Sequence, residues 1–244
     1  MGELIAVLSG KGGTGKTSVC AGVAMALARS GERVLCIDCD MGLRNLDISL
    51  GVSNLSALSF MDICNGGYGL VQVLKHPKCE TLFFLTAPVN CTAQQVDQTL
   101  FGRMLRHARQ GFDYVFLDAP AGVDAGFELA ARFADRVLLV TGPDPASVRD
   151  AATAGQRLEL MGKENVRLIV NRVSRKLIRS LEVTVDDVMD ESGLPLLGVV
   201  PEDIHVPMAA AFQEPLVLHH TRGAAAACRR IARRIQGYRV PVQL

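Results

Sequence analysis

The sequence predicts an α/β fold with a doubly wound, mostly parallel sheet and helices on both of its faces. Apolar strand-like runs alternate with helix-like segments along the chain, and most runs are apolar at nearly every position. Strands that are covered on both faces need apolar side chains on both sides, so such runs are typical of a parallel sheet. The polar motifs follow these runs, where ligands bind in such folds. We expect residues 1–244 to form a single domain, because no linker-like or repetitive segment divides them.

The expected strands are short and begin close to the first residue. They cover Leu4–Leu8, Arg33–Ile37, Leu82–Leu85, Tyr114–Leu117, Arg136–Val140, Arg167–Val170 and Leu196–Val199. Helix-like segments alternate with them, at Ser18–Arg29, Thr92–Arg109, Ser147–Met161, Val183–Glu191 and Gly223–Ile235. The last segment, within residues 223–237, places alanine and isoleucine at helical spacing among its arginines. Bulky Leu, Phe or Trp is typical of a membrane-surface helix, so we expect a terminal helix that packs on the sheet.

Composition favours a cytoplasmic protein. The chain is 49% hydrophobic and carries a formal net charge of +1, which gives the whole molecule no strong attraction to polyanions. No apolar run approaches the roughly 18 residues of a membrane-spanning helix, and the N-terminus lacks a signal pattern. Arginines are concentrated in 167–179 and again after Glu214, where no acid follows. These stretches are candidate anion-binding surfaces, although a solvated helix face is the default interpretation.

The seven cysteines lie mostly among apolar neighbours. In a reducing compartment such thiols usually pack in the core. Cys36 and Cys39 form a C-x-x-C pattern, which raises a redox or metal-binding alternative. No second cysteine pair at zinc spacing lies nearby, so core packing is favoured.

A phosphate-binding loop lies between the first expected strand and the first expected helix. Residues 9–17 read SGKGGTGKT and satisfy the P-loop template G-x4-G-K-[ST], in which backbone N–H groups cradle phosphates and the lysine reaches the terminal ones. The hydroxyl of Thr17 is placed to ligate Mg²⁺. The residues expected at the phosphates are Gly10, Lys11, Gly12, Gly13, Thr14, Gly15, Lys16, Thr17 and Ser18. Because Lys11 has no role in the general template, it is the residue that narrows the function.

The same glycines also fit the G-x-G-x-x-G fingerprint of dinucleotide-binding folds, with an acid about where a ribose contact is expected. Lys16 and Thr17 have no purpose in that fingerprint, which relies on the backbone and the helix dipole. Asp118 ends an apolar strand, as the Mg²⁺-binding acid of a nucleoside triphosphatase does. We therefore favour a nucleoside triphosphate, with a dinucleotide as the minor alternative.

Asp38 and Asp40 close the second expected strand. Two acids this close are costly beside phosphates unless each has a cation or a water to hold. We expect one of them to contact Mg²⁺, directly or through water, and the other to orient the attacking water. Thr17 and Asp118 are the other residues expected at the metal. Residues 119–122, next to Asp118, form a small turn-forming stretch of the kind that responds to a γ-phosphate in switch loops.

At this point the chain resembles the deviant Walker A ATPases of the MinD/ParA family. The matching blocks are KGGTGKT, IDCDMGLRNLDISLG, DYVFLDAPAGV, FADRVLLVTGPDPASVRDA, LIVNRV and PLLGVVPEDIHVPMA. They follow in order from Leu4 to about Val217, which is nearly the whole chain. The block MGLRNLD is more specific to the MinD branch than the P-loop, which the wider family shares.

The resemblance implies an ATPase that dimerises around ATP and Mg²⁺. Lys11 would be the signature lysine that crosses the dimer to the partner's phosphates, and Lys16 would bind phosphate in its own subunit. Asp40 would position the hydrolytic water, so Lys11, Lys16 and Asp40 are the expected catalytic set. This leaves Asp38 with Thr17 and Asp118 as the expected metal-binding set. Adenine would be contacted by Asn171 with the loop of Pro201, Glu202 and Asp203, and Arg172 is a further expected nucleotide-binding residue. A cation supplied in trans contributes on the order of 10³–10⁵ in rate, so we expect slow turnover alone and faster turnover with a partner.

The resemblance further implies a switch that regulates placement of the division septum. Its expected partners are a second copy, an inhibitor of division-ring assembly and an ATPase activator. Thr14 stands where valine is usual, and Ala119 replaces a common serine. Residues 141–145 differ from the usual glutamate-valine pattern in a region that helps to dock partners, which puts partner identity in doubt.

The C-terminus raises a question about membranes. Members of the MinD branch generally end with a basic amphipathic helix that inserts into the membrane, and this sequence stops before any such helix. Either the chain is shortened, or contact with the inner face of the cell membrane is weak or made through another protein. Rival functions are a DNA-partition ATPase, which the near-zero net charge disfavours, and a flagellar-placement relative, which shares most motifs. An iron–sulfur carrier needs an interfacial cysteine pair that is not evident.

Overall fold

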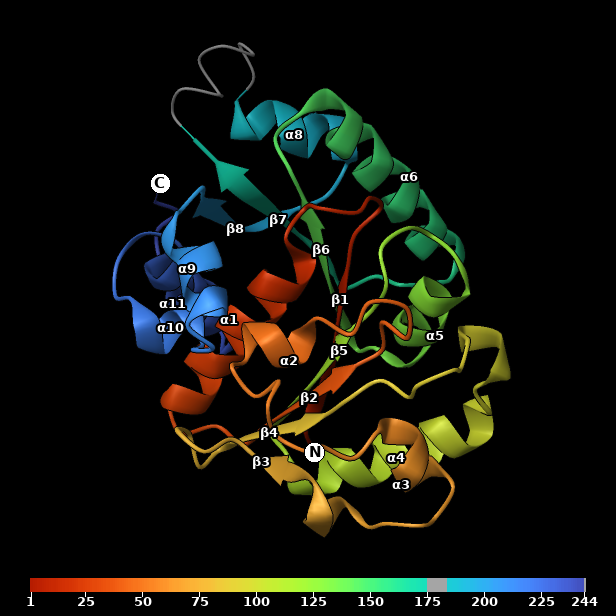
Figure 1. The fold of residues 1–244 in the computed structure, drawn as a ribbon. Coiled ribbons are helices and arrows are strands. Elements are labelled where there is room, and N and C mark those ends of the chain that lie inside the picture. The colour runs from red at the N-terminus through yellow and green to blue at the C-terminus, as the bar shows by residue number, and fades with distance from the viewer. Residues whose placement is uncertain (175–183, 244) are drawn as a thin grey trace.

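The structure is a computed structural model that describes residues 1–174 and 184–243. Its centre is an 8-stranded sheet in the order β3-β4-β2-β5-β1-β6-β7-β8 (Figure 1). The strands are β1 (Glu3–Leu8), β2 (Val34–Asp38), β3 (Leu74–Lys75), β4 (Leu82–Leu85), β5 (Tyr114–Asp118), β6 (Arg136–Thr141), β7 (Val166–Val173) and β8 (Leu196–Pro201). Within the described residues every neighbouring pair is parallel except β3 with β4. The predicted doubly wound, mostly parallel sheet is confirmed.

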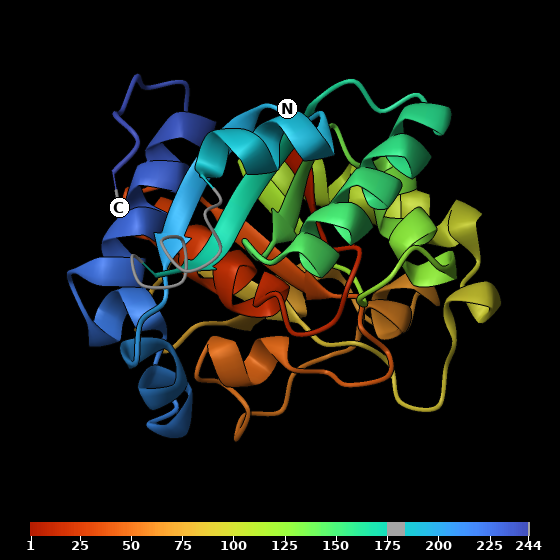
Figure 2. The same cartoon turned by 90° about the horizontal axis from the view of Figure 1, so that it is seen from above.

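Helices lie on both sides of this sheet, as Figure 2 shows from above. They are α1 (Lys16–Arg29), α2 (Leu46–Ser49), α3 (Phe60–Cys64), α4 (Gln98–Gly111), α5 (Ala125–Phe133), α6 (Pro145–Leu160), α8 (Val185–Ser192), α9 (His205–Ala211), α10 (Leu216–His219) and α11 (Gly223–Ile235). The core under one face includes α1 and α11, and the core under the other includes α4, α5 and part of α6. The sheet is therefore the middle layer of three.

The near-continuous apolar runs follow from this layering. In β1, Ile5 and Val7 belong to the core with α1 and α11, whereas Leu4, Ala6 and Leu8 belong to the opposite core. Successive side chains of a strand point to opposite faces, so a strand between two helical layers must be apolar at every position. Strand β1 itself lies at the centre of the sheet, paired with β5 on one side and β6 on the other.

Each expected strand is present, within a few residues of the predicted bounds. The helix predicted over Thr92–Arg109 is wrong in its first part. Ala93–Gln95 form a separate 3₁₀ turn, and α4 begins only after Asp97, whose side chain accepts hydrogen bonds from two backbone N–H groups of the first turn. Asp97 is a good N-cap, and a helix starts where its free N–H groups are capped.

The short elements were not predicted. These are α2, α3, α9, α10 and β3, together with α5, which begins after Asp124 and follows the turn after β5. The helix predicted over Val183–Glu191 corresponds to α8, and its first residue, Val183, lies outside the described residues, as does much of the basic stretch 167–179. The terminal helix α11 packs against α1 and β8, with its alanine and isoleucine side buried.

The topology brings the polar loops to one edge. After β1 the chain builds β2 on one side, and after β5 it crosses to β6 on the other side, so the direction of winding reverses next to β1. Ligands of open α/β sheets bind at such a reversal, beyond the carboxyl ends of the strands. The predicted site residues lie at the carboxyl ends of β1, β2, β5, β7 and β8 or in the loops that follow these strands.

Candidate functional site

The P-loop leaves β1 and enters α1 through left-handed glycines. Gly13 has φ of 81° and Gly15, the N-cap of α1, has φ of 83°. Glycine adopts this conformation without the penalty that a side chain brings. No side chain caps the N-terminus of α1, and no acid lies in its first turn. Free N–H groups and the positive end of the helix dipole together favour an anion at this point.

Two other contacts require glycine because of close packing. A Cβ on Gly10 would lie 2.2 Å from the backbone oxygen of Asp150 in α6. A Cβ on Gly15 would lie 2.3 Å from Nδ2 of Asn171, at the end of β7. The P-loop is thus held between α6 on one side and β7 on the other, with no room for a side chain at either contact.

Lys16 is buried at the centre of the site. Its Nζ lies 2.7 Å from Oδ1 of Asp118, and the two side chains are only 6% and 1% exposed. Burial by itself would lower the pKa of Lys16, but the charge of Asp118 and the hydrogen bond to it raise this pKa above its usual value. Lys16 is therefore a permanent cation in the position that the P-loop template predicts. Thr17 lies beside it, with Oγ1 3.3 Å from the same Nζ.

Asp38 and Asp118 end neighbouring parallel strands at the same level. The carboxylate of Asp38 accepts hydrogen bonds from the N–H groups of Asp40, at 2.8 Å, and Leu46, at 3.2 Å. Asp38 therefore organises the loop from β2 to α2 with both of its carboxylate oxygens. Burial and the nearby charge of Asp118 raise the pKa of Asp38 to about 7, and the backbone hydrogen bonds offset only part of this rise.

Asp40 is half-buried at the edge of the site. Its Oδ1 accepts hydrogen bonds from the N–H groups of Gly42 and Leu43, which close a tight turn. Among the described residues Oδ2 of Asp40 has no such partner. One oxygen thus orients the side chain. The role of Asp40 in orienting a water stays a prediction.

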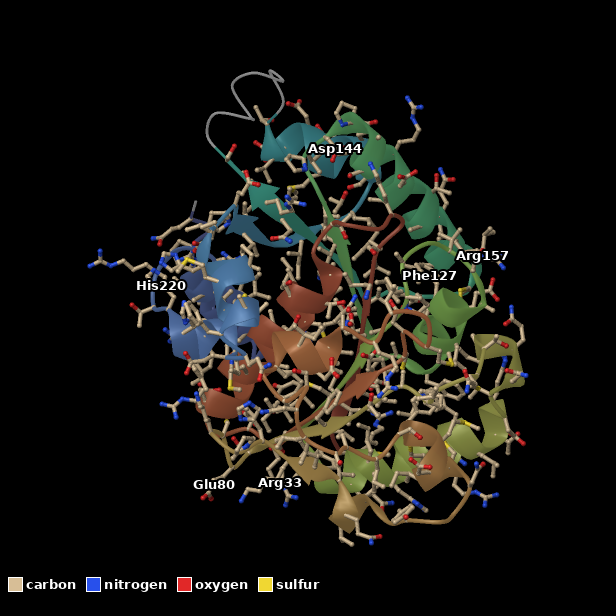
Figure 3. The ribbon with its side chains drawn as sticks, viewed as in Figure 1. Arg33, Glu80, Phe127, Asp144, Arg157 and His220 are labelled. Atoms are coloured by element: carbon tan, nitrogen blue, oxygen red, sulfur yellow. The ribbon has the colours of Figure 1, made fainter. Side chains whose placement is uncertain are left out.

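Lys11 occupies the outer side of the P-loop. Its Nζ lies 3.7 Å from Oδ1 of Asp144, and both side chains are nearly half exposed. Asp144, labelled in Figure 3 at the start of α6, is the N-cap of this helix and accepts hydrogen bonds from the N–H and hydroxyl of Ser147. Sequence reasoning missed Asp144, although an aspartate three residues before a serine, at the start of a helix, is a capping pattern that it could have recognised.

The residues present fit a nucleotide phosphate with Mg²⁺. Three buried oxygens of the site have no hydrogen-bond partner among the described residues: Ser9 Oγ, Thr14 Oγ1 and Asp118 Oδ2. The unpaired oxygen is Oδ2 of Asp118, at the end of β5, and Asp38 and Thr17 lie nearby. Carboxylate and hydroxyl oxygens are the hard ligands that Mg²⁺ prefers. Such buried orphan groups are costly in a protein, and a bound ion or water explains them. The individual metal-binding and catalytic roles stay predictions.

A cavity of about 530 Å³ opens beside the P-loop, toward α9 and α11. Ser18, Asn171, Arg172 and all three residues of the 201–203 loop line it. The apolar part of the lining was not foreseen from the sequence; it consists of Val19, Val200, Ile204, Val206, Pro207, Ala210, Leu216, Ala224 and Cys228. An apolar cavity with few polar groups suits the flat face of a nucleobase.

Both carboxylate oxygens of Asp203 accept hydrogen bonds from within the protein. Its Oδ1 accepts from the backbone N–H of His205, and its Oδ2 accepts from the N–H of Ala224 at the start of α11. The Nδ1 atom of His205 also lies 2.8 Å from Oδ1. The carboxylate therefore caps two helices, and the contribution of Asp203 to base binding would come through the shape of the loop. Glu202 instead pairs with Arg172 at 3.5 Å.

The cysteines give no sign of redox or metal chemistry. All seven are free, and both members of the C-x-x-C pattern, Cys36 and Cys39, are fully buried. Burial raises the pKa of each of these two thiols, which makes them poor nucleophiles and poor metal ligands. In the part of the chain that the structure describes, no group of three or more His, Cys, Asp or Glu side chains is arranged to hold a metal ion.

Comparison with known proteins decides the family. Residues 5–216 match the family model described as the CobQ/CobB/MinD/ParA nucleotide binding domain. The chain belongs to this family. The septum site-determining protein MinD of Bacillus subtilis is 37% identical over 254 residues, which cover 100% of this chain and 92% of that protein.

Solved structures agree with this assignment to the MinD/ParA family. The MinC:MinD cell division protein complex of Aquifex aeolicus contains a chain that is 32% identical, with a TM-score of 0.91, over 99% of this chain and 98% of that one. MinD of Pyrococcus horikoshii, complexed with Mg-ADP, is 27% identical with a TM-score of 0.83, over 96% of each chain. Our chain is thus a P-loop ATPase of the MinD/ParA family, and it shares the fold of these proteins.

Among the helices that the structure describes, none is long and apolar enough to cross a membrane. Most arginines of α11 donate hydrogen bonds to backbone carbonyl groups of the protein. Arg229 donates to the carbonyl oxygens of Val217, His220 and Thr221, and Arg234 donates to that of Val240.

Proposed function

We propose that this protein is an ATP-dependent dimerising switch with slow ATP hydrolysis. The observation that carries the proposal is the placement of the two P-loop lysines on different sides of the loop. Lys16 is buried against Asp118 inside the site, whereas Lys11 lines a separate hollow of about 350 Å³ together with Asp144. A lysine on that outer side suits phosphates presented by a second copy of the chain.

Within one subunit, the P-loop N–H groups and Lys16 would hold the phosphates, and the cavity beside α9 and α11 would hold the base. Thr17, Asp118 and Asp38 would hold Mg²⁺, which supplies charge neutralisation of the phosphates. Asp40 would orient the attacking water through its free oxygen. Lys11 from the second copy would add positive charge against the transferring phosphoryl group, so that hydrolysis and assembly depend on the same contact.

The first test is the mass of the protein in solution. Light scattering should give a monomer without nucleotide or with ADP, and a dimer with ATP. The variant Lys11→Ala should bind ATP and remain monomeric. Lys75→Ala is a matched control. Lys75 is a half-exposed lysine on the distant strand β3, and it forms an ion pair with Glu80. An ATP dimer of Lys11→Ala would show that the trans-lysine model is wrong.

We further propose that the dimer regulates placement of the division septum. Support comes from the relatives, which are named septum site-determining proteins, and from the solved complex of MinD with MinC. A partner of the MinC kind and a separate ATPase activator would bind the ATP-bound dimer. The rival DNA-partition role has less support, because three of the four α11 arginines, Arg229, Arg230 and Arg234, donate to carbonyl oxygens of the protein.

Pelleting assays separate these roles. The variant Asp40→Ala, expected to be held in the ATP state, is sedimented with anionic liposomes and separately with DNA, each in ATP and in ADP. ATP-dependent pelleting with liposomes supports a division-placement role at the membrane. Pelleting with DNA alone would support partition and contradict our proposal. The double variant with Lys11→Ala shows whether pelleting depends on the dimer.

A further inference from the structure

Two neighbouring residues at the end of β7 hold two neighbouring carbonyl groups of the P-loop. Nδ2 of Asn171 donates to the backbone oxygen of Thr14 at 2.7 Å, and Nη1 of Arg172 donates to the backbone oxygen of Gly13 at 3.2 Å. Asn171 is buried and Arg172 is exposed. The contacts link residues far apart in the chain, and they act on the part of the loop that turns into α1.

The backbone of Arg172 makes this double contact feasible. Consecutive residues of a strand normally point to opposite faces, so two of them rarely reach the same loop. Arg172 has φ of 58°, in the left-handed region, and the pairing of β7 with β8 shifts register between Val170 and Val173. This conformation is strained for arginine but not for glycine. A strained backbone that persists at a site is an observation from which a role can be inferred.

Arg172 also stands between the two parts of the nucleotide site. Its Nη2 lies 3.5 Å from Oε1 of Glu202, on the predicted base-binding loop. Arg172, Gly13 and Glu202 line both the cavity beside α9 and the hollow on the Lys11 side. The guanidinium therefore forms a partition between the two spaces, fixed to the phosphate loop at one end and to the base loop at the other.

We propose that Arg172 is a positioning residue, which holds the P-loop in its phosphate-binding form through the Gly13 carbonyl while Asn171 holds the next one. The left-handed backbone at Arg172 serves this double contact. The inference rests on the proposed binding of nucleotide phosphates at the P-loop. It differs from a base contact, because Arg172 then acts on the phosphate part of the ligand whether or not a base is attached.

Calorimetric titration with two ligands tests the proposal. Pyrophosphate and ADP, each with Mg²⁺, are titrated into the wild-type protein, Arg172→Gly and Arg149→Ala. Loss of one charge-assisted hydrogen bond should weaken both ligands by the same factor, about tenfold, in Arg172→Gly. Arg149→Ala is the control for lost positive charge near the P-loop, since Arg149 is an exposed residue of α6, and it should bind both ligands normally.

A second measurement addresses the backbone. Without ligand, Arg172→Gly should melt several degrees above Arg172→Ala, because only glycine relieves the left-handed strain. Equal melting temperatures would contradict the role given to the backbone. If Arg172→Gly weakened ADP and left pyrophosphate unchanged, Arg172 would be a base contact and the proposal would be overturned, as it would if neither ligand were affected. A wild-type protein that bound neither ligand would instead refute the proposed nucleotide site itself.

Discussion

Lys16 and Asp118 form an ion pair with 2.7 Å between Nζ and Oδ1, and it is almost completely removed from solvent. The contribution of a buried ion pair to stability is the difference between two opposing quantities. These are the free-energy cost of taking both charges out of water and the attraction between the charges in a medium of low dielectric. Here the second oxygen of Asp118 remains without a partner among the described residues. The pair is thus an incomplete network, which a phosphate near Lys16 and a cation near Asp118 would complete.

Lys16→Met should lose nucleotide binding and stability together. The substitution leaves a buried carboxylate without its cation, which costs about 3–5 kcal/mol. Urea unfolding measures the stability, and titration with ADP measures the affinity. The double variant with Asp118→Asn removes both charges, so it should regain most of the stability and none of the affinity. Normal ADP affinity in either variant would refute the P-loop assignment.

Asp40→Ala should keep ATP bound and turn it over at least a hundredfold more slowly, because positioned acids and bases contribute about 10²–10⁴ in rate. Phosphate release measures turnover, and light scattering should show an accumulated ATP dimer. Asp47→Ala is the control, since Asp47 lies in the adjacent α2 and, within 1–174 and 184–243, its carboxylate accepts only from the N–H of Ile48. Unchanged turnover in Asp40→Ala would exclude Asp40 as the water-orienting acid.

Asp144→Asn should strengthen the ATP dimer a few-fold. Lys11 must leave Asp144 to reach a second copy, and an exposed pair of this kind contributes about 0–1 kcal/mol. Asparagine caps a helix about as well as aspartate, so the melting temperature should change little. Sedimentation equilibrium with ATP gives the dimer constant. A weaker dimer would mean that Asp144 itself contacts the second copy.

Asp38 should make the ligand-free protein less stable as the pH rises. Burial and the charge of Asp118 raise its pKa from 3.8 to about 7, so the folded state holds a proton that the unfolded state has lost between these two pH values. The free energy of unfolding should fall there, with a slope of up to about 1.4 kcal/mol per pH unit, and level off above. Chemical unfolding in EDTA measures this slope, which should be shallower in Asp38→Asn. Equal slopes would contradict the assignment.

Much of the site could be predicted from the sequence because it rests on backbone requirements. Gly13, Gly15 and Lys16 follow from the geometry of a phosphate loop, and Asp118 from the end of an apolar strand. The short helices α2, α3, α9 and α10 could not be predicted, because elements of four to seven residues carry too little periodicity. The helix expected from Thr92 was misplaced because the cap at Asp97 was not weighed against the apolar pattern.

Contacts between segments that are distant in the sequence could not be predicted either. Nothing in local spacing shows that Asp144 faces Lys11, that Arg172 reaches Gly13, or that Asp203 caps α11. Each of these contacts joins loops that only the strand order brings together. The polar loops were predicted to share one edge of the sheet, but the partner of each side chain within that edge depends on tertiary packing.

The contact between Gly10 and Asp150 has a mechanical consequence. Because a Cβ at Gly10 would collide with the Asp150 carbonyl, the phosphate loop and the first turns of α6 touch main chain to main chain. No side chain lies between them to absorb a displacement by changing rotamer. A displacement of α6 by a molecule docked on its outer surface would therefore displace the phosphate loop as well. Movement of the phosphate loop would in turn displace α6.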